Sequence, residues 1–181
     1  TFLQRAFDML IQDVGLQHLP VVFAVDRAGL VGDDGPTHHG AFDLSFLRLI
    51  PGMTVMAPSS QEELQRMLAT ALAGDGPAAL RYPRGMAAPF VQPAAIAPLE
   101  VGRGVVLQEG GDVALVGIGT GVGIAREAAA VLGAHGAPPT LVDARFVKPL
   151  DVGLMEQLAA RHSRIVTVEE NTLAGGFGSA V

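Results

Sequence analysis

Cysteine and tryptophan are both absent from this 181-residue chain, and aromatic residues make up only 5% of it. Without cysteine the chain can form no disulfide, no thiolate metal site and no cysteine nucleophile. With so few aromatic residues, its core must be built from Ala, Val, Leu and Ile, which the hydrophobic fraction of 49% supplies amply. The lack of cysteine is compatible with a reducing compartment, and we expect a soluble cytoplasmic protein.

Clusters of basic residues and long apolar stretches are absent from the sequence as well. The sequence has no basic cluster and a net charge of −6, so we expect no nucleic-acid partner. No apolar stretch approaches the roughly 18–20 residues that span a bilayer, so we expect no membrane partner. The chain enters a helical pattern directly at Thr1 and stops at Val181, just after GGFGSA. We therefore expect an internal piece of a longer polypeptide, whose upstream portion would be a partner of this chain.

The spacing of apolar residues predicts alternating helices and strands in the first half. Leu3, Phe7, Leu10 and Val14 recur at the spacing of an amphipathic helix. The run VVFAV at 21–25 predicts a buried strand. The further elements expected are a helix over 41–50, a strand over 53–57, a helix over 61–73 begun by a capping box of Ser60 and Glu63, and a strand over 78–83.

Residues 86–98 interrupt this alternation with three prolines among small uncharged residues, which predicts an extended linker. The elements expected after it are strands over 113–119, 140–144 and 164–170, a helix from a Gly-rich turn to about Ala134, and a helix from Asp151 to about Arg161. The predicted fold class is α/β, with two mostly parallel-sheet domains that carry helices on both faces. We place the domains at 1–85 and 99–181.

The loop DRAGLVGDDGPTHHG, residues 26–40, carries the densest polar chemistry of the chain. It follows a predicted strand, and ligands gather beyond the carboxyl ends of strands in open α/β sheets. A loop histidine is usually only solvated, but His38 and His39 lie together near Arg27, Asp33 and Asp34. Imidazoles in such a place can pass protons to and from a substrate oxygen. A zinc site is disfavoured, because adjacent side chains point apart and no typical ligand spacing accompanies them.

Arg27, Arg81 and Arg84 form a second cluster of candidates. RYPRG at 81–85 ends a predicted strand, so Arg84 is expected on the same sheet rim as Arg27. Two guanidinium forks at one rim suit a phosphate or carboxylate, which they bind bidentately. Two surface salt bridges would account for the same residues equally well.

The segment GIGTGVG at 117–123 resembles a dinucleotide-binding turn. The fingerprint GxGxxG requires a third glycine three positions after the second, and those positions hold Val122 or Ile124. Asp143, at the end of the next strand, imitates the acidic residue that binds a ribose. Because the match is only partial, we interpret the segment as a tight structural turn.

Five segments of the chain form a specific set: TFLQRAFD (1–8), DRAGLVGDDGPTHHGAFD (26–43), RYPRG (81–85), DARFVKPLD (143–151) and EENTLAGGFGS (169–179). On this set the chain resembles the 1-deoxy-D-xylulose-5-phosphate synthases, transferases of the transketolase superfamily. The resemblance implies a thiamine-diphosphate- and Mg2+-dependent homodimer that condenses pyruvate with D-glyceraldehyde 3-phosphate. Its product feeds isoprenoid and thiamine biosynthesis. Residues 1–85 would be the later part of the pyrimidine-binding domain and 99–181 most of the transketolase C-terminal domain.

The resemblance also implies roles for single residues. Phe2 would stack on the aminopyrimidine of the cofactor, and His38 would be the catalytic residue that donates or orients a proton. Arg27 and Arg84 would hold the aldehyde's phosphate. Arg5 and Asp34 would line the same pocket. His39 is given no catalytic role, because its position in the family is often Gln, and the C-terminal domain is expected to supply dimer contacts.

Two motifs of the family do not occur in this chain. The GDG…N motif that binds Mg2+ and the diphosphate is missing, and so is the glutamate that protonates the aminopyrimidine. The resemblance therefore implies that the main cofactor ligands lie upstream and that this chain alone is inactive, with no metal ligand of its own. Two alternatives stay open: a transketolase or the β subunit of a 2-oxo-acid dehydrogenase, and a noncatalytic assembly module.

Overall fold

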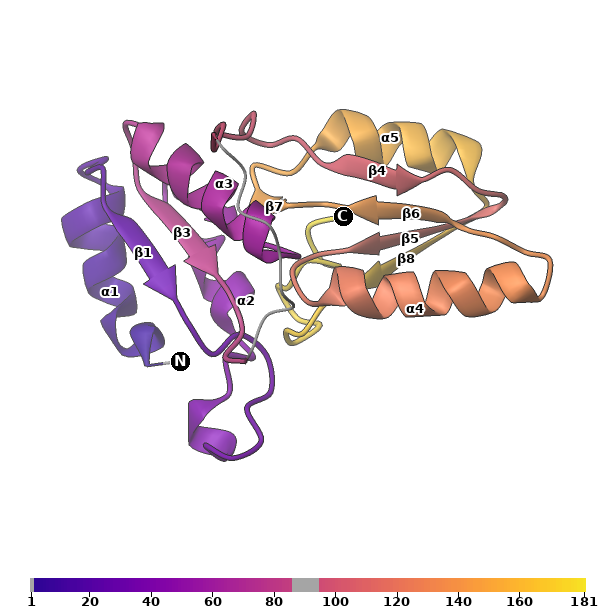
Figure 1. The fold of residues 1–181 in the computed structure, drawn as a ribbon. Helices are drawn as coiled ribbons and strands as arrows, with labels where there is room; N and C mark the ends of the chain where they lie inside the picture. The colour runs from indigo at the N-terminus through magenta and orange to yellow at the C-terminus, as the bar shows by residue number, and fades with distance from the viewer. Residues whose placement is uncertain (1, 86–94) are drawn as a thin grey trace.

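The computed structural model describes residues 2–85 and 95–181 and arranges them around two four-stranded sheets (Figure 1). Within each sheet, three neighbouring strands are parallel and one edge strand is antiparallel. The predicted α/β class with two mostly parallel sheets is confirmed. The linker predicted over 86–98 lies mainly outside the described residues, and residues 95–98 at its end are exposed.

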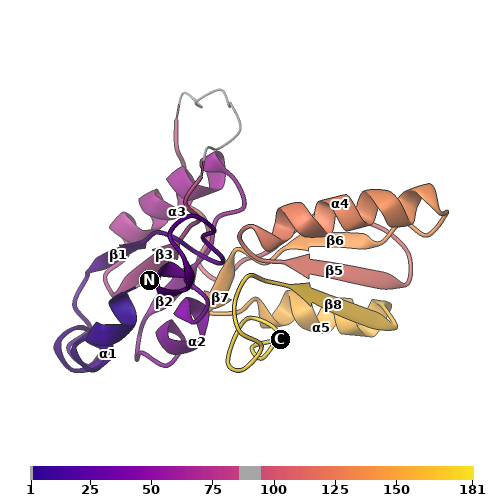
Figure 2. The ribbon, with the colours of Figure 1, turned by 90° about the horizontal axis from the view of Figure 1, so that it is seen from below.

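The first sheet has the strand order β1-β3-β2-β7. Its strands are β1 (Val22–Val25), β2 (Thr54–Met56), β3 (Ala78–Arg81) and β7 (Phe146–Lys148). The helical segments of this half are a 3₁₀ turn (Leu3–Ala6), α1 (Phe7–Met9), a π-helical turn (Leu10–Gly15), α2 (Asp43–Leu47) and α3 (Gln61–Ala73). Figure 2 shows α3 on one face of the sheet and α1 with α2 on the other. As predicted, α3 begins at Ser60, whose hydroxyl accepts a hydrogen bond from the Glu63 amide at 3.1 Å.

The second sheet has the order β4-β6-β5-β8. Its strands are β4 (Val105–Gln108), β5 (Val113–Gly117), β6 (Thr140–Asp143) and β8 (Arg164–Val168), and α4 (Gly121–Ala134) and α5 (Val152–Arg161) cover its opposite faces. Asp151 begins α5 as predicted, because its carboxylate accepts the Leu154 amide at 3.0 Å. Strands β4 and β7 were not predicted. Each is a short antiparallel edge strand, and β7 pairs with β2, a partner far away in the sequence.

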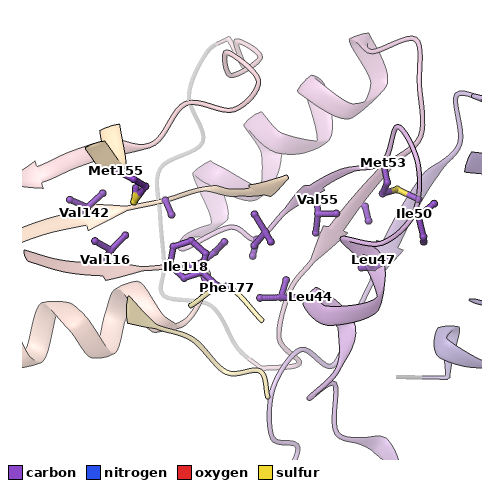
Figure 3. Close-up of a cluster of buried hydrophobic side chains, with 14 of the residues drawn as sticks. Leu44, Leu47, Ile50, Met53, Val55, Val116, Ile118, Val142, Met155 and Phe177 are labelled. Carbon is purple, nitrogen blue, oxygen red and sulfur yellow. The ribbon is translucent and has the colours of Figure 1, made fainter. Parts of the chain in front are cut away.

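The two halves share one hydrophobic core (Figure 3). Leu44 and Val55 from the first half belong to the same buried cluster as Val116 and Ile118 from the second. Phe177, from the segment after β8, is completely buried and lies between Leu44 and Ile118 in this cluster. Since β7 also completes the first sheet, the second half supplies both a strand and core side chains to the first.

Polar contacts reinforce this junction. The Ser59 hydroxyl donates to the Asp143 carboxylate at 2.5 Å, and Arg145 forms a two-pronged ion pair with Glu63 at 2.8 Å. Burial raises the pKa of Asp143, although its hydrogen bond from Ser59 opposes that rise. We therefore expect the two sheets to behave as one mechanical unit.

Replacing Phe177 should show how strongly the shared core holds the chain together. Phe177→Ala leaves a cavity between the two halves and should lower the free energy of unfolding by about 3–5 kcal/mol. Urea denaturation of the protein that contains this chain measures the change. The matched control is Leu173→Ala, at a site in the same segment that is 85% exposed and should change stability by less than about 0.5 kcal/mol. Equal effects of the two substitutions would contradict the shared core.

Candidate active site

A cavity of about 390 Å3 opens at the carboxyl end of β1. The residues around it come from the first helical turn, from β1 and from the loop that follows β1: Phe2, Leu3, Phe23, Ala24, Val25, Asp26, Arg27 and His38. In Figure 1 this loop projects beyond the carboxyl ends of β1 and β3. The cavity thus lies where an open α/β sheet is expected to bind a ligand.

Phe2 and His38 meet on the cavity wall. Their ring centroids are 5.0 Å apart, with the planes close to perpendicular at 78°. The Arg5 guanidinium also lies over the Phe2 ring, 5.4 Å from its centroid. Phe2 is 47% exposed, so its ring is available to a ligand rather than used up in core packing. Phe2 therefore contacts two other predicted site residues, His38 and Arg5.

The two adjacent histidines have different surroundings. His38 lines the cavity, and its Nδ1 lies 3.0 Å from the Thr37 hydroxyl. His39 instead accepts a hydrogen bond from the Val31 amide through its own Nδ1 at 3.0 Å. His39 thus ties the two sides of the loop together, while His38 remains at the cavity.

Arg27 and Arg84 converge on the carboxylate of Asp34. Arg27 Nε donates to Asp34 at 2.9 Å, and Arg84 Nη1 contacts both of its oxygens at 2.5 Å. The hydrogen bond from Arg84 and then that from Arg27 lower the pKa of Asp34 to about 2. Arg27 also has a positive φ of 59°, an uncommon backbone conformation for a residue other than glycine. The two arginines can therefore hold one oxyanion at the cavity rim.

Arg81, the third arginine of this group, has a different position. It is only 2% exposed, and its Nη2 donates to the carbonyls of Gly40 at 2.7 Å and Glu170 at 2.5 Å. Its Nε lies 3.4 Å from the carboxylate of Asp43, which is also completely buried. Burial lowers the pKa of Arg81 and raises that of Asp43, in each case against the attraction of the partner charge. The sequence analysis gave Arg81 no role; the available signal was a charged residue ending an otherwise apolar strand.

The glycines of the turn between β5 and α4 are closely packed. A Cβ at Gly117 would lie 2.6 Å from the backbone of Val122, and one at Gly119 would lie 3.2 Å from the Ala57 side chain. The turn is therefore packed tightly on its own helix and on the first half of the chain. Asp143, which imitated a ribose-binding acid, accepts hydrogen bonds from Ser59 and the Arg145 amide. These contacts agree with the interpretation of the turn as structural.

Metal-ligating groups and membrane-spanning helices were both looked for in the described residues. Across residues 2–85 and 95–181, no three His, Cys, Asp or Glu side chains are grouped as a metal site would require. In the same parts of the chain, no helix has the length and apolar character needed to cross a membrane.

Two domains of one known protein family together match nearly all of this chain. Residues 1–89 match the transketolase pyrimidine-binding domain and residues 102–181 match the transketolase C-terminal domain. The chain therefore belongs to the transketolase family. The first half of the chain, which carries the cavity at the carboxyl end of β1, is thus a pyrimidine-binding domain. The second half is the C-terminal domain that follows it.

Curated relatives narrow the resemblance. All 181 residues match 1-deoxy-D-xylulose-5-phosphate synthases, with 55% identity to that of Carboxydothermus hydrogenoformans and 58% to that of Chlorobium luteolum. The resemblance inferred from the motifs is confirmed over the whole chain. The chain spans 29% of the length of these relatives. A solved structure described as a split-gene transketolase, inactive β4 tetramer, superimposes with a TM-score of 0.88 and 33% identity, covering 99% of this chain and 58% of that one.

The Asp34 carboxylate should titrate far below its ordinary range. Its folded-state pKa of about 2 lies under the ordinary 3.8, so the stability it contributes is present at higher pH. That contribution should be lost as the pH falls through the interval between those two values. Arg84→Met should return the pKa toward 3.8, and Arg27→Met should do so by a smaller amount.

Carboxyl NMR titration of the three proteins measures these shifts. Arg126→Met, which removes an exposed arginine from α4, is the matched control and should leave the pKa of Asp34 in place. An unchanged pKa in Arg84→Met would show that the contact is not formed in solution.

Proposed function

We propose that this chain is part of a 1-deoxy-D-xylulose-5-phosphate synthase, which condenses pyruvate with D-glyceraldehyde 3-phosphate and releases CO2. The observation that carries the proposal is the convergence of Arg27 and Arg84 on one carboxylate beside a cavity lined by Phe2 and His38. A phosphate is the oxyanion that distinguishes the aldehyde substrate from pyruvate. Whole-chain identity above 50% to synthases of that name supports the same reaction.

The arginine pair is proposed to bind the phosphate of the aldehyde. Both guanidiniums reach a single anionic group, and charge-assisted fork contacts are the strong form of such hydrogen bonds. Asp34 stands where a phosphate oxygen would be held, so a bound substrate would share the arginines with it or displace it. Asp34 would thereby tune how tightly the phosphate binds.

The cavity residues fit one end of thiamine diphosphate. The half-exposed Phe2 ring offers a flat apolar surface for the aminopyrimidine. Thiamine diphosphate supplies carbanion stabilisation when bound, and the protein supplies orientation and electrostatics. We propose that Mg2+ and the diphosphate are held by the part of the synthase that this chain does not cover, because the family's GDG…N motif does not occur in the 181 residues.

His38 is proposed to move a proton on the substrate. Its imidazole lines the same cavity as Arg27 and contacts the Phe2 ring edge to face. A neutral imidazole in that place can donate to a developing hydroxyl or hold a carbonyl oxygen. The Thr37 hydroxyl beside Nδ1 would help fix which ring nitrogen faces the substrate.

The synthase is proposed to be a cytoplasmic homodimer. In the whole synthase, a second subunit or the rest of the polypeptide would cover exposed apolar side chains such as Leu30 at 75% and Phe42 at 53%. A transketolase is less favoured, because the transketolase structure is 33% identical to this chain, whereas the synthases are 52–58% identical. A noncatalytic module is less favoured, because it would not need His38 and paired arginines at a cavity.

Substitution of the two histidines separates their roles. His38→Ala in the full-length synthase should reduce turnover by about 10²–10⁴-fold, the usual contribution of a general acid or base. His39→Gln keeps an acceptor for the Val31 amide and should stay within about twofold of the wild type. Steady-state kinetics measure both. Normal turnover in His38→Ala together with a large loss in His39→Gln would reverse the assignment.

Removing either rim arginine should affect one substrate selectively. Arg27→Met and Arg84→Met should each raise KM for the phosphorylated aldehyde by about 10–100-fold, through loss of a charge-assisted contact. The KM for pyruvate should change much less. Arg126→Met again serves as the control. Equal increases for both substrates would argue against a phosphate role.

The 181-residue chain by itself should not bind thiamine diphosphate measurably. One aromatic stack contributes only about 0.5–1.5 kcal/mol beyond its buried area, whereas micromolar binding needs roughly 8 kcal/mol. Titration calorimetry of the chain with the cofactor and Mg2+ tests this, with the full-length synthase as the positive control. A low micromolar dissociation constant for the chain would mean that the cofactor site has been misplaced.

A further inference from the structure

Glu170 connects the C-terminal domain to the loop that carries Asp34 and His38. It lies in the segment directly after β8 of the second sheet, and it is half-buried. Its backbone carbonyl accepts a hydrogen bond from Arg81 Nη2 at 2.5 Å. The same nitrogen donates to the Gly40 carbonyl at 2.7 Å, so one guanidinium joins Glu170 to the end of the loop.

The Glu170 side chain reaches the other end of the loop. Its carboxylate accepts a hydrogen bond from the Thr120 hydroxyl and lies against Gly29, where a Cβ would come within 2.6 Å of Oε2. Gly29 and Gly40 exchange backbone hydrogen bonds of 3.1 and 2.9 Å, which close the base of residues 30–39. Glu170 is therefore connected to both sides of the loop base: its carboxylate lies directly against Gly29, and its carbonyl is linked to Gly40 through Arg81.

We propose that Glu170 is a positioning residue through which the C-terminal domain holds the loop of Asp34 and His38 in place for the acceptor substrate; this rests on the function proposed above. Asp34 is held from outside the loop by Arg84, and His38 contacts the ring of Phe2. The base of the loop, where Glu170 lies, sets the direction from which these residues reach the cavity. Small displacements of such groups weaken catalysis strongly, because binding and proton transfer depend on geometry.

Glu169 provides a matched comparison within the same segment. Its carboxylate accepts the amides of Phe177 and Gly178 at 2.7 and 2.8 Å. Glu169 thus organises the C-terminal segment, whereas Glu170 contacts the loop base. Substituting the two neighbours separates general loosening of the C-terminal segment from an effect on the loop.

Two measurements on the full-length synthase test the proposal. Glu170→Ala should speed hydrogen–deuterium exchange in peptides that cover residues 29–40 and should raise KM for the phosphorylated aldehyde about tenfold. Glu169→Ala should do neither, even if it lowers the melting temperature equally. Glu170→Gln keeps the shape and an acceptor for Thr120, so it should restore both properties to within about threefold of the wild type.

If Glu170→Ala fails to fold, Thr120→Val is used in its place, because it removes the hydroxyl that holds the Glu170 carboxylate. Faster exchange over residues 29–40 and a higher KM for the phosphorylated aldehyde are then expected from Thr120→Val. Unchanged exchange over 29–40, unchanged KM for the aldehyde, or equal effects from Glu169→Ala would each overturn the proposal. A wild-type protein without synthase turnover would refute the proposed function instead, and the exchange experiment would still decide whether Glu170 holds the loop.

Discussion

The buried guanidinium of Arg81 is the contact on which the candidate site depends. It sits at the end of the central strand β3 and donates to two backbone carbonyls, one at the end of the active-site loop and one in the segment after β8. Only the planar, multidentate donor of an arginine can serve these carbonyls and the Asp43 carboxylate together. Because a buried charge must keep its partners, the three segments are fixed relative to one another.

The junction between the two halves likewise fixes distant segments relative to one another, over a larger area. Strand β7 completes the first sheet, and Phe177 enters the core formed by Leu44 and Ile118. A C-terminal domain expected to supply only subunit contacts therefore also shapes the first domain. This explains how a residue after β8 comes to touch a loop after β1, and why the site cannot be understood from the pyrimidine-binding domain alone.

Much of the fold follows from local signals in the sequence. The ends of α3 and α5 were predicted closely, because Ser60 and Asp151 cap the first turns of those helices through their own side chains. The central parallel strands were predicted because each is a continuous apolar run. Strands β4 and β7 were missed, because each forms only by pairing at a sheet edge with a strand that is distant in the sequence.

The sequence by itself determined the α/β class, the family, and the set of polar residues gathered at the carboxyl end of β1. Only the tertiary structure decided how these residues are paired. Arg27 and Arg84 meet at Asp34, His38 faces the cavity while His39 holds the loop, and Arg81 is buried beneath them. The physical reason is that residue type and spacing fix which chemistry is available near a strand end, whereas charge pairing and burial depend on segments that meet only when the chain is folded.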